Sequence, residues 1–147
     1  MATTPSFSTQ LLGQTEKTLN AILDRLLAGT GVDEPQWVTL TIAVTSGGSV
    51  ERDALVSRVA GSLKLSDVDA RARVDELAAA QLLEAVGVDG SSVRVTDAGK
   101  RLHGRIRGAV VEITGRMWGD LPAGDLAAAG RVLATVLERA NAELARA

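Results

Sequence analysis

The side chains best suited to binding chemistry in this chain are four cations that follow a short predicted hairpin. Lys100, Arg101, Arg105 and Arg107 lie close together, and His103 is the other titratable group among them. Lysine and arginine neutralise phosphates, so such a cluster suits contact with a nucleic-acid backbone. Basic clusters on helices are more often solvated faces, and it is the position beside the hairpin that favours a phosphate contact here.

The sequence contains no comparable set of residues suited to catalysis. His103 is the single histidine and the chain has no cysteine, so a metal site would have to be built from carboxylates. We interpret His103 as a helix-surface histidine near arginines. The pairs Gly47-Gly48 and Gly29-x-Gly31 are helix-ending turns and not phosphate-binding loops, because neither follows a strand. The sequence therefore predicts no enzyme, no metal and no cofactor.

The composition indicates one helical domain covering residues 1–147. Two tryptophans and one phenylalanine are the only large aromatics, so aliphatic side chains must form the core. The net charge of −2, from 16 Lys and Arg against 18 Asp and Glu, is unlike that of a strongly electrostatic nucleic-acid binder. No apolar run is long enough to span a membrane. Residues 1–10 lack the features of a signal peptide and are expected to be frayed, which favours a cytoplasmic protein.

Helical spacing of apolar residues predicts six helices, and turn residues predict one hairpin between the fourth and the fifth. Asp89-Gly90 favours a tight turn between strands 84–86 and 93–95. Ser49 is predicted to cap the third helix and Ser66 the fourth, because a serine hydroxyl can accept a free backbone N–H. The expected helices cover residues 9–28, 33–46, 51–63, 66–81, 97–118 and 124–145.

The order helix, helix, helix, hairpin, helix over residues 35–107 predicts a mainly α winged helix-turn-helix. The helix at 66–81 is the recognition-helix candidate, with Ala70, Val74 and Leu77 on its buried face. The winged lobe would cover residues 34–96. The apolar stripes of 9–30 and 97–147 exceed what so small a lobe can cover, and we expect them to bury each other across a two-fold axis in a homodimer.

Several short motifs in this order resemble the MarR family of bacterial transcriptional regulators. They are Pro35-Gln36-Trp37, Leu65-Ser66 with Val74-Asp75 and Leu77, Val95-Thr96-Asp97-Ala98-Gly99, and Leu121-Pro122-Ala123-Gly124-Asp125-Leu126. The resemblance covers nearly the whole chain after Thr9. It implies an obligate dimer that reads a pseudo-palindromic operator in double-stranded DNA. It also implies a small-molecule effector pocket between the dimer helices and the winged lobes.

Two features depart from that family. The outer face of the recognition helix consists of Val68, Asp69, Ala72, Asp75 and Glu76, where family members commonly place Ser, Thr and Arg. A valine or alanine there can contact a thymine methyl, and an aspartate can accept from cytosine N4. The predicted wing tip, 87–92, contains no arginine, whereas the family's wing normally carries an Asp-x-Arg pattern.

The remaining cations are expected to supply backbone contacts. Arg71 and Arg73 flank the recognition helix, Arg94 lies on the returning strand, and Lys100 and Arg101 lie at the root of the wing. The full set of candidate DNA contacts is Lys64, Ser66, Val68, Asp69, Arg71, Ala72, Arg73, Ser91, Ser92, Arg94, Lys100 and Arg101.

Trp37 is the candidate for effector binding, since the resemblance puts a pocket beside it and an indole can form an apolar wall. Core packing is the alternative role for Trp37. An alternative also stands for the whole chain: a winged-helix dimer that acts by protein contact or ligand sequestration without binding DNA. The acidic face of the recognition helix and the arginine-poor wing are the features that divide the two.

Overall fold

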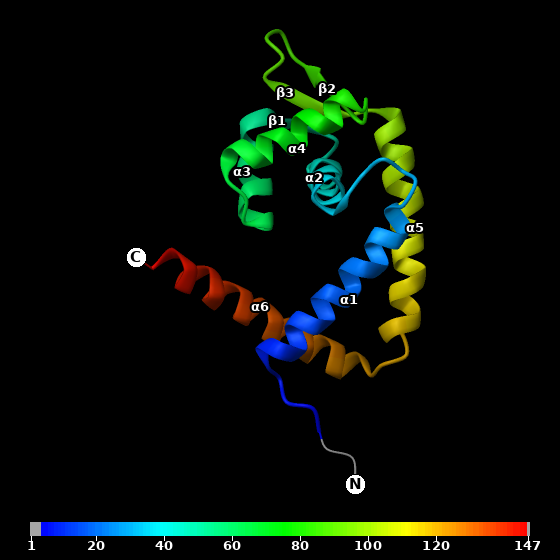
Figure 1. Cartoon of the computed structure of the whole chain (residues 1–147), viewed down its shortest axis with the longest axis vertical. Coiled ribbons are helices and arrows are strands. Elements are labelled where there is room, and N and C mark those ends of the chain that lie inside the picture. The colour runs from blue at the N-terminus through cyan, green and yellow to red at the C-terminus, as the bar shows by residue number, and fades with distance from the viewer. Residues whose placement is uncertain (1–3, 147) are drawn as a thin grey trace. The chain divides into compact units, whose positions relative to one another are not determined.

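The computed structural model describes residues 4–146, so Met1–Thr3, the start of the expected frayed terminus, and Ala147 lie outside the described residues. The predicted mainly α winged-helix fold is confirmed (Figure 1). The described chain divides into two compact units, which meet in sequence at Val110 and Val111. The elements in chain order are α1 Thr9–Leu27, α2 Glu34–Thr45, β1 Ser49–Glu51, α3 Arg52–Leu63, α4 Asp67–Ala79, β2 Leu83–Val86, β3 Ser92–Val95, α5 Asp97–Trp118 and α6 Ala123–Ala145.

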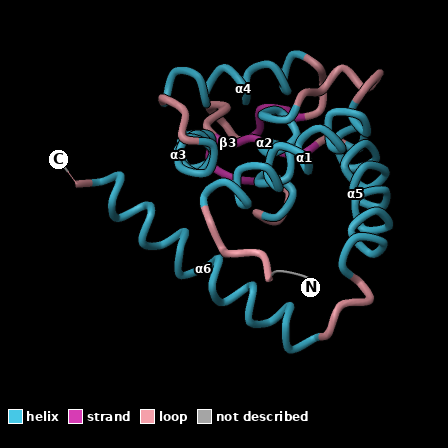
Figure 2. The backbone as a smooth tube through the Cα atoms, turned by 60° about the horizontal axis from the view of Figure 1, so that its bottom comes forward, coloured by secondary structure: helices cyan, strands magenta, loops and turns pink. Residues whose placement is uncertain are grey.

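The core of the first unit lies where α2, α3 and α4 pack on one another (Figure 2). Leu40, Leu55 and Leu77 are fully buried at this centre, one from each helix. Leu27 near the end of α1 and Ile106 of α5 belong to the same buried cluster. The core is aliphatic apart from Trp37, as the composition requires, and it fixes α4 by one face only.

The recognition-helix candidate forms as expected. Ser66 caps α4, and its hydroxyl accepts the backbone N–H of Asp69 at 3.1 Å. Ala70, Val74 and Leu77 are buried, which confirms the predicted inner face. The opposite side of the helix is therefore left available to another molecule.

The wing contains one strand more than predicted. β1 pairs antiparallel with β3, which pairs with β2, giving the order β1-β3-β2. Ser49 was expected to cap the third helix, and this is wrong: Ser49 lies in β1 opposite Arg94. The pairing places half-buried Val50 beside Val93 and against the core. The ladder continues to Arg52, whose N–H donates to the carbonyl of Ser91 at 2.8 Å, so the start of α3 is held by the sheet and not by a side-chain cap.

A glycine is required where the wing joins α5. A Cβ atom built on Gly99 would lie 2.3 Å from the carbonyl oxygen of Leu82 and 2.9 Å from Cγ1 of Val95. Thr96 connects the same segments, because its hydroxyl donates to the carbonyl of Gln81 and accepts the N–H of Gly99. The base of the wing and the first turn of α5 thus form one rigid corner.

The second unit contains the end of α5 and the whole of α6. No residue of α6 is buried in the isolated chain, although Leu126, Leu133, Leu137 and Leu144 lie along it. Among residues 4–146, no helix is both long and apolar enough to cross a membrane.

Candidate nucleic-acid interface and effector site

The start of α4 presents its side chains to solvent. Ser66, Val68, Asp69 and Arg71 are exposed, and Ala72 is half-buried behind them. Lys64, just before α4, adopts the left-handed conformation with φ of 58° that ends α3, and its ammonium donates to the carbonyl of Gly61 at 2.8 Å. The six predicted contacts at 64–72 therefore do lie on one short segment at the N-terminal end of the helix. This is the end from which a recognition helix contacts base edges.

The flanking arginines are all engaged by carboxylates of the winged lobe. Arg71 pairs with Asp53 of α3 at 3.2 Å, and Arg94 pairs with Glu84 across the β2–β3 ladder at 2.6 Å. Arg73 donates from Nε and Nη2 to the two oxygens of Glu76, at 2.7 and 2.8 Å. The sequence indicated cations flanking an acidic face; in the structure, acids of the lobe largely neutralise these cations.

Two acids of that predicted outer face are also turned onto partners. Asp75 accepts from Arg52 at 2.9 Å, and Glu76 accepts from Arg73 and from Gln36. Among the described residues, Asp69 is the acid of the predicted face that forms no ion pair, and Val68 and Ala72 are apolar. The part of α4 that is open to a partner is thus smaller and less acidic than the sequence indicated.

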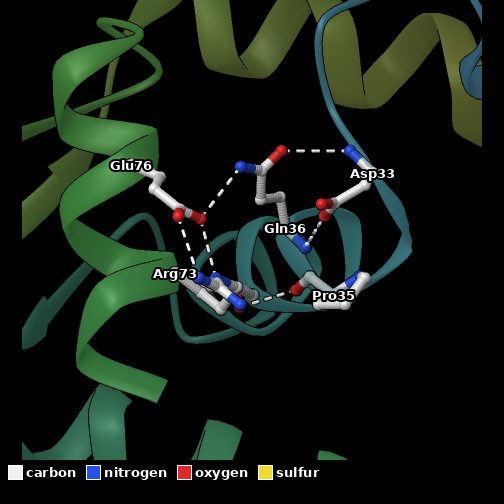
Figure 3. Close-up of polar contacts among 6 residues, drawn as sticks. Asp33, Pro35, Gln36, Arg73 and Glu76 are labelled. Atoms are coloured by element: carbon white, nitrogen blue, oxygen red, sulfur yellow. Dashed lines mark hydrogen bonds and ion pairs between the residues drawn. The ribbon is translucent and has the colours of Figure 1, made fainter. Parts of the chain in front are cut away.

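Gln36 connects α4 to the start of α2 (Figure 3). It forms a reciprocal capping box with Asp33, and its Nε2 donates to Oε1 of Glu76 at 3.0 Å. Hydrogen bonds from Arg73 and then Gln36 hold the pKa of the Glu76 carboxyl below its ordinary value. Bonding to Glu76 in turn raises the pKa of Arg73. Glu76 therefore connects Arg73 to Gln36, which precedes Trp37 in the sequence.

The wing tip is a β-turn in which the N–H of Gly90 donates to the carbonyl of Gly87. Both glycines have positive φ, 92° and 69°, which explains why glycine stands there. Asp89 is directed onto Ser91: the hydroxyl of Ser91 and then its backbone N–H lower the pKa of the carboxyl. Ser91 is exposed and Ser92 is half-buried, so both lie beside the tip as expected.

The root of the wing carries Lys100 and Arg101, both exposed. Lys100 lines a polar cavity of about 410 Å³ together with Glu84, Arg94 and Asp97. The lining thus contains two cations and two carboxylates. The predicted backbone contacts at the root therefore share their surface with acids, as those on α4 do.

The sequence predicts a helix-surface histidine near arginines at His103; it lies on α5 near Arg107 as predicted, but the surface position is wrong. It is half-buried and stacks on Trp37, with ring centroids 4.9 Å apart and planes 17° from parallel. Burial, and next the charge of Arg107, lower the pKa of His103. Its Nε2 and the Oγ1 of Thr41 are buried without a hydrogen-bond partner in the described part of the chain. Trp37 is only 8% exposed, so it packs in the core and lies beside unsatisfied polar atoms at the same time.

The side-chain pairs around α4 could not be predicted from the sequence, because their members are far apart along the chain. Gln36 and Glu76 are 40 residues apart and Asp53 and Arg71 are 18 apart, so no local spacing connects them. Within residues 4–146, no group of three potential metal-ligating side chains occurs.

Comparison with known proteins matches no family model and no curated protein, but it matches many solved structures. A MarR family transcriptional regulator from Silicibacter pomeroyi is 20% identical with a TM-score of 0.75, over 90% of this chain and 88% of that one. The PcaV transcriptional regulator from Streptomyces coelicolor, solved with its natural ligand, is 21% identical with a TM-score of 0.69, over 95% and 99%. MepR from S. aureus, solved with DNA, is 14% identical with a TM-score of 0.72, over 92% and 99%. The chain has the fold of the MarR-family transcriptional regulators.

Proposed function

We propose that this protein is a DNA-binding transcriptional regulator of the MarR type, in which α4 enters the major groove and the wing follows the adjacent minor groove. The observation that carries the proposal is the exposed first turn of α4, held by Ser66 and packed by its opposite face on α2 and α3. The DNA complex of MepR, which shares the fold, supports it. The role is that of a binding protein in the cytoplasm and not that of an enzyme.

The regulator acts as a homodimer. Exposed apolar side chains continue from Met117 and Trp118 at the end of α5 along α6 to Leu144. A soluble monomer rarely leaves so much contiguous apolar surface in water, and a second copy would cover it. Two winged lobes related by a two-fold axis would read a pseudo-palindromic operator, with half-sites about one helical turn apart.

A DNA phosphate can bind these arginines only by replacing the carboxylates that they already bind. Arg71, Arg73 and Arg94 each hold a carboxylate, and a phosphate would have to replace it. Exposed ion pairs contribute only about 0–1 kcal/mol each, so the exchange is feasible, but the displaced carboxylate still repels the backbone. The carboxylate on Arg71 is the most readily replaced, because the single contact between Arg71 and Asp53 is the longest of the three ion pairs, at 3.2 Å. We therefore expect weak non-specific binding.

The effector is a small, partly apolar molecule bound beside Trp37. The stacked Trp37 and His103 offer an aromatic wall, and the unpartnered His103 Nε2 and Thr41 Oγ1 offer hydrogen bonds. The ligand complex of PcaV supports this class of regulator. In a Trp118→Phe background, titration with candidate ligands should change Trp37 fluorescence at the concentrations that alter DNA binding. A ligand that alters DNA binding with unchanged Trp37 fluorescence would contradict this location.

The experiment for DNA binding selects genomic fragments with the purified protein at low salt and measures the enriched fragments by mobility shift. The test variant replaces Arg71, Arg73 and Arg94 with alanine. A matched control removes the same three positive charges outside the winged lobe, at Lys17, Arg116 and Arg146. We expect tight binding by the wild type and the control, and a large loss in the test variant.

A second function is favoured by the same ion pairs. If the wild type binds DNA no better than the triple variant, the carboxylate-paired surface serves a protein partner, and the protein is a winged-helix dimer that acts without DNA. The neutralisation of Arg71, Arg73 and Arg94 is the observation in its favour.

A further inference from the structure

The winged lobe exposes two large apolar side chains. Across residues 12–110, all of them described, Val68 and Val88 are the large apolar residues that are exposed, at 77% and 110%. The lobe buries its other valines, leucines and isoleucines wholly or in part, so these two exceptions stand out. One lies in the first turn of α4 and the other at the tip of the wing, the two places that the proposed function brings to DNA.

At the wing tip, Val88 is exposed, and the charged side chains near it are bound to other residues of the wing. Val88 occupies a corner of the turn from Gly87 to Gly90, and the turn projects it fully into solvent. The neighbouring Asp89 carboxylate is bound to Ser91, and Arg94 is held by Glu84 on the strand behind. The side chain that projects furthest into solvent at the wing tip is therefore apolar.

The first turn of α4 also presents an exposed valine, and the exposed carboxylates of Asp67 and Asp69 lie on either side of it in sequence. Val68 is the second residue of the helix, between the cap Ser66 and the exposed Asp69. The nearest arginine along the helix, Arg71, is held by Asp53. Val68 therefore lies exposed at the end of α4 from which a recognition helix contacts base edges.

We propose that this protein reads its operator mainly by apolar contacts: Val68 packs on a thymine 5-methyl group in the major groove, and Val88 lies in the minor groove against an A·T pair. The inference rests on the proposed function and gives it a specificity. Thymine is the base that presents a methyl group in the major groove. In the minor groove only a G·C pair presents an amino donor, guanine N2, and Val88 would bury that donor without a partner.

The major-groove contact is tested with uracil, which is thymine without the methyl group. In the duplex that the wild type selects, each thymine of a half-site is replaced in turn by uracil, and Kd is measured by fluorescence anisotropy. We expect one position per half-site at which the change weakens wild-type binding about fourfold, the effect of one buried methyl group. The Val68→Ser variant, which lacks both methyl groups of the valine, should bind thymine and uracil duplexes equally at that position.

The minor-groove contact is tested with inosine, which is guanine without the 2-amino group. Each A·T pair at the flank of the half-site is replaced by G·C and, separately, by I·C. We expect one step at which G·C weakens binding about tenfold and I·C restores it, because an unpartnered buried donor has that cost. Val88→Gly should remove the difference between the two duplexes.

The outcomes separate the inference from the function on which it rests. A selected duplex that binds tightly but shows no uracil effect and no difference between G·C and I·C would overturn the apolar reading alone. Failure to select any duplex would overturn the proposed function and the inference together. Circular dichroism of Val68→Ser and Val88→Gly should match the wild type, since both side chains are exposed.

Discussion

Replacing Gly99 with alanine should destabilise the protein at the corner between the wing and α5. The new Cβ would lie 2.3 Å from the Leu82 carbonyl oxygen and 2.9 Å from Val95 Cγ1, so backbone has to move. Forcing an extra methyl group into a packed site costs about 1–3 kcal/mol. Alanine is favoured over glycine within a helix by about 1 kcal/mol, which offsets part of that cost. The net expectation is a loss of up to about 2 kcal/mol in the free energy of unfolding.

Gly104→Ala in the same helix is the matched control. A Cβ there meets no atom within 4 Å, so only the helix preference remains. This variant should gain about 0.5–1 kcal/mol. Urea unfolding followed by circular dichroism, at one fixed chain concentration, gives both values. If Gly99→Ala were as stable as Gly104→Ala, the close packing of the wing root on α5 would be refuted.

Three further predictions concern assembly, charge and pH. Leu133→Asp should monomerise or unfold the protein, because it buries an unpaired charge in the proposed dimer interface, and light scattering would then no longer give twice the chain mass; an unchanged dimer would contradict that interface. Asp53→Asn should tighten binding to any DNA and leave sequence preference unaltered, because it releases Arg71 and removes a charge that repels phosphate; mobility shifts at several salt concentrations measure this, and weaker binding would contradict it. The pKa of His103 is lowered in the folded state, so the unfolded chain takes up a proton first as pH falls. The stability contributed by neutral His103 is therefore full above about pH 6.5 and is lost as pH falls below it. Thermal unfolding between pH 7.5 and 5 should show this fall in the wild type and less of it in His103→Gln.

Most of the fold could be predicted from sequence because it is specified locally. Apolar spacing defined the helices, and Ser66 marked the start of α4 through a hydrogen bond that spans three residues. β1 was not predicted, because three residues carry almost no periodic signal and its partner strand, β3, is distant in the sequence. For the same reason Ser49 was mistaken for a helix cap.

The site was less predictable, because its chemistry depends on which side chains meet. The sequence placed Arg71 and Arg73 beside the outer face of α4 but did not reveal that Asp53 and Glu76 bind them. The stacking of His103 on Trp37 joins α5 to α2 and likewise has no local signature. Exposure of single residues is also set by tertiary packing.

The central claim, that two winged lobes of a dimer read an operator, is tested most directly by footprinting. Hydroxyl-radical cleavage of the best selected genomic fragment, with and without protein, would locate each contact on both strands. We expect two protected half-sites related by two-fold symmetry, about 10 bp from centre to centre, with protection of the minor groove outside each by the wing. Protection that is absent, or that spreads evenly along the fragment without preferred half-sites, would contradict it.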